Sequence, residues 1–204
     1  MTGIGAGPRQ EPAFDAVLVM LRERGAETIE HPGGTLLAHL IRIFERLAGH
    51  GASRELQYAG LAHAAYGTDG FDVALLSHLD REPLRALVGS EAELMIYRYG
   101  GCDRSRTWSE LARTKQVWSR FDRSVDLLAP ADLRAFVDLS IVNELDVLER
   151  APAIAEKHGQ YFRDLFAGWR PLASPQVMAD AAAVLSRIPG GTSDSGCTGR
   201  ETDG

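Results

Sequence analysis

The chain has 204 residues, of which 45% are apolar, and a formal net charge of −6 at pH 7. A chain of this length fits one domain or one domain with a tail, and its acidic balance argues against a nucleic-acid-binding surface. No stretch of about 18 apolar residues predicts a membrane span, and the first residues lack the basic and apolar segments of a secretory signal. We therefore expect a cytoplasmic protein with no nucleic-acid or membrane partner; no oligomeric state is predicted.

Apolar residues recur at the three- and four-residue spacing of amphipathic helices along most of the chain, which predicts an all-α domain over residues 11–188. Residues 1–10 are expected to be a flexible N-terminus, and the polar, Gly-rich residues 189–204 a disordered C-terminal tail. Segment 100–129 has no clear period, which is typical of loop with a short helix or a hairpin. The expected helices are, in chain order, residues 11–24, 35–48, 54–66, 72–79, 81–88, 90–99, 130–150, 152–167 and 175–188.

Four of these helices begin with a capping signal. Thr35 and Ser53 stand at the start of the second and third helices, and Ser174 precedes a first-turn proline. Ser90 and Glu93 have the spacing of a capping box, in which each side chain bonds the backbone N–H of the other.

Two histidines on neighbouring helices are the main candidates for chemistry. His39 lies on the flank of the apolar face of the second helix, and His63 ends a stripe that contains Ala59 and Gly60. The two small residues allow another helix to approach closely. Neutral imidazole is the commonest protein ligand of transition metals, so the pair is interpreted as sharing one ion. The alternative is two core histidines, each bonded to a backbone carbonyl.

A carboxylate in the long helix 130–150 is the third candidate ligand. Glu144 falls in the middle of an apolar stripe, and a buried carboxylate needs a partner, which a metal, His39, His63 or an arginine would supply. Asn143 lies on the edge of the stripe and is a supporting candidate. The periodicity turns Asp146 away from it.

The turns beside the histidines supply further candidates. His31, in the loop before Pro32, is a candidate acid/base group, a further ligand or a plain loop histidine. Tyr66 and Asp69 are candidates for catalysis or substrate binding, and Thr68 for support of the histidines. The alternative for this segment is a plain turn with Asp69 at its tip.

The region around the two histidines resembles the HD-domain superfamily, helical metal-dependent phosphohydrolases with some non-haem iron oxygenase relatives. In that family one helix carries a histidine and the next a His-Asp doublet about two dozen residues later; here the separation from His39 to His63 is 24 residues. The sequence is most similar to an uncharacterised bacterial group that carries HPGGTLLxHL and HxxYGTxGF, matched at residues 31–40 and 63–71. The resemblance covers about residues 12–150 and implies a single HD-like helical bundle.

The chain departs from the family pattern at two places. Ala64 stands where the resemblance implies the aspartate of the doublet, and no clear final aspartate exists, because Asp146 is predicted to face outward. What remains is a mononuclear site with His39, His63 and Glu144 as ligands.

These features predict a metal-dependent enzyme that acts on a small molecule with Fe, Mn or Zn as cofactor. Its chemistry is either hydrolysis by a metal-activated water or oxidation at an iron with open coordination positions. The rival prediction is a metal-free ligand-binding or interaction module on the same scaffold, which the loss of the doublet aspartate at Ala64 favours.

Overall fold

The computed structural model describes residues 12–71 and 73–188. Within these ranges the chain forms ten helices and two small β-hairpins, so the expected all-α fold is a mostly helical one. The hairpins are β1 (Glu30–His31) with β2 (Gly34–Thr35), and β3 (Gln116–Trp118) with β4 (Val125–Leu127). The helices are α1 (Pro12–Glu23), α2 (Leu36–Gly49), α3 (Arg54–Ala62), α4 (Glu82–Val88), α5 (Ser90–Gly101), α6 (Arg104–Thr107), α7 (Leu111–Thr114), α8 (Pro130–Arg150), α9 (Pro152–Trp169) and α10 (Pro175–Leu185).

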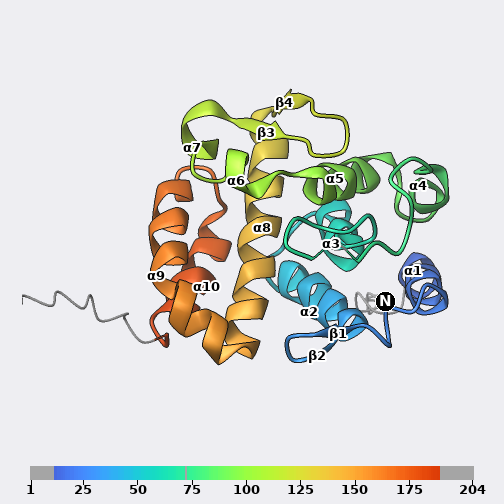
Figure 1. The fold of residues 1–204 in the computed structure, drawn as a ribbon, viewed down its shortest axis with the longest axis horizontal. Helices are drawn as coiled ribbons and strands as arrows, with labels where there is room; N and C mark the ends of the chain where they lie inside the picture. The colour runs from blue at the N-terminus through green and yellow to red at the C-terminus, as the bar shows by residue number, and fades with distance from the viewer. Residues whose placement is uncertain (1–11, 72, 189–204) are drawn as a thin grey trace, which may run out of the picture.

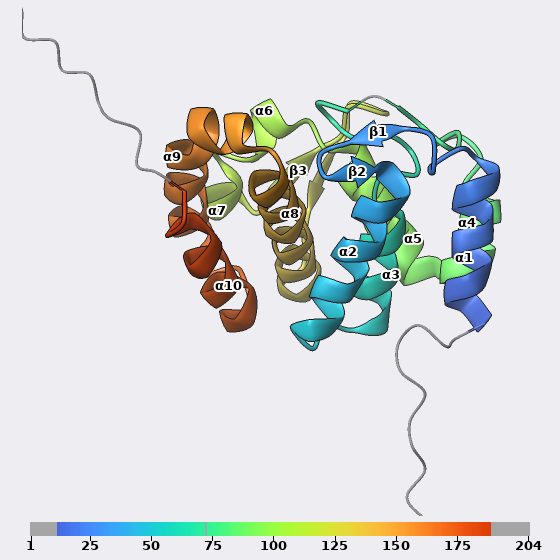
Figure 2. The ribbon, with the colours of Figure 1, turned by 90° about the horizontal axis from the view of Figure 1, so that it is seen from below.

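Helix α8 runs through the middle of the molecule. In Figure 1 it stands between α9 and α10 on one side and α2, α3 and α5 on the other, and Figure 2 shows the same order from below. A helix covered on two sides has little solvent face, so polar positions become buried together with apolar ones. This arrangement explains why Asp138, Ser140, Asn143, Glu144 and Asp146 are all buried. No helix of the described residues is long and apolar enough to cross a membrane.

Helices α2 and α3 form the pair that carries the two histidines. Thr35 accepts a hydrogen bond from the Ala38 N–H, and Ser53 accepts one from Leu56, so both predicted caps are confirmed. Gly60 of α3 lies directly against α2: a Cβ built there would stand 2.5 Å from a Leu47 methyl carbon. The close approach that the small residues predicted is therefore present.

Replacing Gly60 by alanine is expected to lower the free energy of unfolding by about 1–3 kcal/mol, because the added methyl group overpacks the contact with Leu47. Chemical denaturation measures the effect. Gly49→Ala at the end of α2 is the matched control, since no atom lies within 4 Å of the added methyl group. Equal stability of the two variants would contradict the packing of α3 on α2.

Three expectations about local structure are wrong. The third helix ends at Ala62 rather than near Tyr66, because the chain turns at His63. Residues 73–79 form turns and no helix. The capping box does not form: Gly89 is the N-cap of α5, and Glu93 is buried in an ion pair with an arginine.

The remaining expectations about helices are confirmed within one to three residues at their ends. The Ser174 cap forms, and the segment 100–129 contains two short helices and a hairpin. Residues 1–10 and 189–204, expected to be flexible and disordered, lie outside the described residues.

Candidate functional site

His39 and His63 meet in the interior, where α2 lies against the end of α3. His39 is fully buried and His63 is 2% exposed. Their Nε2 atoms are 3.4 Å apart, and the rings stand nearly perpendicular. The structure therefore brings together the two histidines that the sequence singled out.

Each ring is held through its other nitrogen. His39 Nδ1 lies 2.7 Å from a carboxylate oxygen of Asp146, and His63 Nδ1 lies 2.8 Å from the carbonyl oxygen of Gly60. Both partners are acceptors, so both Nδ1 atoms donate. In a neutral imidazole the Nε2 atom is then unprotonated and carries a lone pair. Both lone pairs consequently point toward the gap between the rings.

Asn143 of α8 adds a third acceptor. Its Oδ1 lies 3.0 Å from His39 Nε2, while its Nδ2 donates to Glu144 Oε1 at 2.9 Å. The bond to the carboxylate fixes the orientation of the amide, because only the NH₂ group is a donor. Three acceptor atoms thus converge with no donor between them, unless a proton or a metal ion stands there.

Asp146 and Arg42 form the support behind His39. Arg42 donates to both carboxylate oxygens at 2.7 Å, and also to the Pro32 carbonyl in the loop that carries His31. Burial raises the pKa of Asp146, but hydrogen bonds from Arg42 and His39 outweigh it and hold the pKa below its usual range. The prediction that Asp146 faces outward is wrong, because its side chain is buried against His39 and Arg42 of α2.

Glu144, predicted as a ligand, makes its contacts elsewhere. Its Oε1 accepts from Arg104 Nη1 at 2.9 Å and from Asn143, rather than from either histidine. Arg104 is held in turn by the Tyr99 hydroxyl and by the face of Trp108. Within residues 12–71 and 73–188, no group of three or more His, Cys, Asp or Glu side chains is arranged to hold a metal. Asn143, rather than the predicted Glu144, therefore forms the trio with His39 and His63.

A cavity of about 420 Å³ opens beside the trio. Its wall includes His63 and Asn143 of the trio, together with Ala64, Thr68 and Asp69 from the turn after α3. Two of the predicted supporting or catalytic residues, Thr68 and Asp69, therefore reach the same space as the histidines. This volume is within the range of small-molecule sites.

His31 lies at the same cavity and stacks on His39, with ring centroids 4.0 Å apart. Burial, and then the nearby His39 ring, lower the pKa of His31 to about 4. His31 is therefore unprotonated at neutral pH and keeps an acceptor nitrogen. Its role as an acid/base group stays a prediction.

Tyr66, predicted as a catalytic residue, does not line the cavity. Its hydroxyl donates to Glu93 Oε1 at 2.9 Å, on the side of α5. Burial and then the Glu93 carboxylate raise the pKa of Tyr66 above its usual value. Since α3 ends at Ala62, the turn rotates Tyr66 away from His63.

Sequence reasoning missed two supporting arginines. Arg42 follows His39 by three residues and so shares its helix face, which is a usable signal. Arg104 lies 40 residues from Glu144 in the sequence, and no local pattern connects them.

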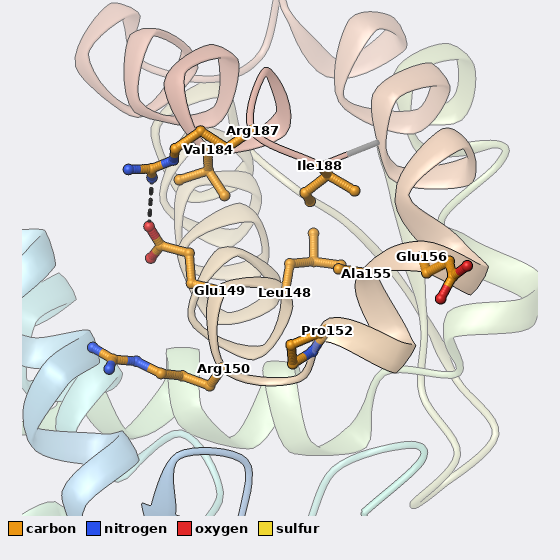
Figure 3. Close-up of a pocket in the computed structure, with 9 residues that line it drawn as sticks. All are labelled: Leu148, Glu149, Arg150, Pro152, Ala155, Glu156, Val184, Arg187 and Ile188. Atoms are coloured by element: carbon orange, nitrogen blue, oxygen red, sulfur yellow. Dashed lines mark hydrogen bonds and ion pairs between the residues drawn. The ribbon is translucent and has the colours of Figure 1, made fainter. Parts of the chain in front are cut away.

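A second cavity, of about 660 Å³, lies at the junction of α8, α9 and α10. Figure 3 shows Leu148 and Ile188 facing each other across it, with Glu149 and Arg187 paired at its edge. Its lining contains no histidine and no buried polar side chain. The smaller cavity beside the histidines is therefore the candidate site.

The acid stability of the metal-free protein should report on His63. Burial, and then the His39 ring, lower the pKa of His63 to about 3, whereas an unfolded histidine has a pKa of about 6.5. Below that value the unfolded chain binds a proton that the native state does not, so stability is lost as pH falls. The free energy of unfolding should fall by up to about 1.4 kcal/mol per pH unit from this group.

Denaturation of EDTA-treated protein between pH 7 and pH 4 measures this dependence. His63→Gln removes the titrating ring and should flatten the curve, while the exposed His158→Gln should not. Parallel curves for His63→Gln and the parent would contradict a neutral His63.

One family model matches part of the chain. It is described as "Domain of unknown function (DUF6817)" and matches residues 20–104. No curated protein matches the chain. The matched segment runs from α1 to the start of α6 and includes His31, His39, His63 and Asp69, but not α8. Over these residues, which carry both histidine motifs and the turn that lines the cavity, the chain is similar to that family.

Proposed function

We propose that the protein is a metal-dependent enzyme that acts on a small molecule in the cavity beside His39 and His63, on an HD-like scaffold. The observation that carries this proposal is that His63 Nε2 and Asn143 Oδ1 lie 3.4 and 3.0 Å from His39 Nε2, which makes three facing acceptors when both rings are neutral. Buried acceptors that face one another are costly unless a cation stands among them. A divalent ion satisfies all three at once.

The surroundings of the trio fit a metal. The ring nitrogen of a metal-bound histidine that does not bind the ion typically donates a hydrogen bond to a carboxylate or a backbone carbonyl. Nδ1 of His39 and Nδ1 of His63 have such partners. Imidazole ligands suit Fe and Zn, and the oxygen of Asn143 adds a harder ligand that also suits Mn. In this proposal Glu144 orients Asn143 and does not bind the ion.

The protein groups at the cavity can then bind a substrate and move a proton. A bound ion supplies Lewis acidity for a water-derived nucleophile in the hydrolytic version, or open positions for oxygen in the oxidative one. His31 holds an unprotonated nitrogen beside His39 and accepts a proton from a group in the cavity. Asp69 and Thr68 offer hydrogen-bond acceptors to the substrate from the same wall.

The second candidate is a metal-free ligand-binding module. Ala64 lines the cavity where the family resemblance implies a carboxylate ligand, which favours this candidate. In that case His39 carries a second proton, donates it to Asn143 and is balanced by Asp146. The two candidates differ in whether a metal ion or a proton stands among the three acceptors.

Metal analysis of protein purified without a His-tag separates them. We expect about one metal ion per chain after incubation with Fe²⁺, Mn²⁺ or Zn²⁺ and removal of excess. His39→Ala should lose the ion, while His78→Ala should keep it, because His78 stacks on Phe121 outside the cavity. Circular dichroism checks that both variants fold. A parent protein that retains none of the three metals would overturn the enzyme proposal in favour of the module.

A further inference from the structure

The cavity lined by His31, His63 and Asn143 (the histidine cavity) has two carboxylates, each with one oxygen that lacks a partner within residues 12–71 and 73–188. Asp69 accepts from the Arg104 N–H through Oδ2 at 2.8 Å, and its Oδ1 has no partner among the described residues. Glu144 uses Oε1 for Arg104 and Asn143, and its Oε2 is likewise without a partner in that part of the chain. Both residues line the cavity. The wall therefore offers two charged acceptors to a bound molecule.

The same wall offers little to an anion. Among the described residues that line it, Arg104 is the one arginine or lysine. Its guanidinium already donates to Glu144 and to the Tyr99 hydroxyl, and lies 4.6 Å from the ring centroid of Trp108. Recognition of phosphate normally uses a free guanidinium or ammonium group. The negative charge of the two carboxylates therefore exceeds the positive charge of the single guanidinium, which already has partners.

The rest of the wall is aromatic and aliphatic. Phe71, Tyr161 and Phe162 line the cavity, and Tyr161 is 49% exposed, so its ring is accessible from solvent. Aromatic faces attract cations, and they also pack against apolar groups. Carboxylates combined with aromatic rings form the usual recognition chemistry for an ammonium group.

We propose that this cavity takes a small organic cation, with an ammonium group on an aromatic or apolar body, and that Asp69 selects the ammonium group. This inference rests on the proposed function, because it assigns the substrate class of the same cavity. For the side chains of the wall, without a bound metal ion, it also places phosphate esters below the organic cation in affinity. The selecting atom is Asp69 Oδ1, the oxygen that is not used to hold Arg104.

Three probes with the same ring test the selection. Benzylamine, benzyl alcohol and phenyl phosphate present positive, neutral and negative groups on similar bodies, and their affinities are measured by calorimetric or NMR titration of the EDTA-treated full chain. We expect benzylamine to bind at least about tenfold more tightly than the other two. Phenyl phosphate as the tightest ligand would overturn the proposal.

A matched substitution assigns the selection to Asp69. Asp69→Asn keeps an oxygen for the Arg104 N–H but removes the charge, and should weaken benzylamine about tenfold while leaving benzyl alcohol unchanged. Asp126→Asn is the control and should change neither affinity, because Asp126 lies on β4 in an exposed ion pair with Arg98 of α5. Equal benzylamine affinity in Asp69→Asn and the parent would overturn the role of Asp69.

Metal content of the same proteins before EDTA treatment separates this inference from the proposed function. Asp69→Asn should keep the metal of the parent; simultaneous loss of metal and of benzylamine binding would show that Asp69 serves the metal and would overturn the selection. If the parent holds no metal but binds benzylamine through Asp69, the enzyme proposal fails and the assigned ligand class stands.

Discussion

Asp146→Asn is expected to lower the affinity of the protein for a divalent metal by about 10- to 100-fold. The carboxylate accepts the Nδ1–H of His39 at 2.7 Å and so keeps the Nε2 lone pair directed toward His63 and Asn143. Asparagine retains the shape but loses the charge, and its NH₂ group cannot accept from Arg42. His39 is then less basic and less firmly oriented, although no group that touches the ion has been removed.

The structure contains a matched control for this substitution. Asp180 accepts from Arg46 and from His50, an arrangement like that of Asp146 with Arg42 and His39, but it lies outside the histidine cavity. Asp180→Asn should cost stability and leave metal affinity unchanged, as measured by competition with a fluorescent chelator. Equal metal affinity in Asp146→Asn and the parent would contradict the supporting role of Asp146.

Glu93→Ala is expected to lower the free energy of unfolding by about 3–5 kcal/mol. Glu93 is fully buried and accepts two hydrogen bonds from Arg81, at 2.7 and 2.6 Å, and one from the Tyr66 hydroxyl. Its carboxylate therefore joins α5 to the start of α4 and to the turn after α3. Removing it leaves a guanidinium and a buried hydroxyl without their partner. Chemical denaturation gives the change in stability.

Glu110→Ala is the comparison for Glu93→Ala. Glu110 forms an exposed pair with Arg113 one helical turn away, and such pairs contribute about 1 kcal/mol or less. Neither variant should alter metal affinity or benzylamine binding, because neither residue lines the histidine cavity. A Glu93→Ala protein as stable as Glu110→Ala would mean that Glu93 does not join these elements.

Periodicity predicted the buried residues of helices with a single apolar face, but not all the buried polar residues of α8, which is covered on two sides. Helices α1 and α2 follow their apolar stripes closely. For α8, the apolar stripe alone assigned Asp146 to solvent, whereas the side chain is buried against His39 and Arg42 of α2. A sequence pattern reports one face at a time, so contacts with two neighbours cannot be read from it.

The location of the site was predictable from the sequence, but the choice of side chains that meet there was less so. His39 and His63 were found because each sits on the inner side of a helix end. Neighbouring positions on a helix differ by about 100°, which was too coarse to choose between Asn143 and Glu144. The choice depends on Arg104, which binds Glu144 from a distant part of the chain. Tyr66 was misplaced because the end of α3 could not be fixed to within a turn.

The protonation of the two imidazoles before and after metal addition tests the central claim most directly. A long-range ¹H–¹⁵N spectrum of ¹⁵N-histidine protein identifies which nitrogen of each ring carries hydrogen. We predict that one equivalent of Zn²⁺ leaves Nδ1–H in place on His39 and His63 and shifts both Nε2 resonances to values typical of a metal-bound nitrogen. A spectrum in which His39 keeps a proton on Nε2 and Zn²⁺ changes neither ring would contradict the account.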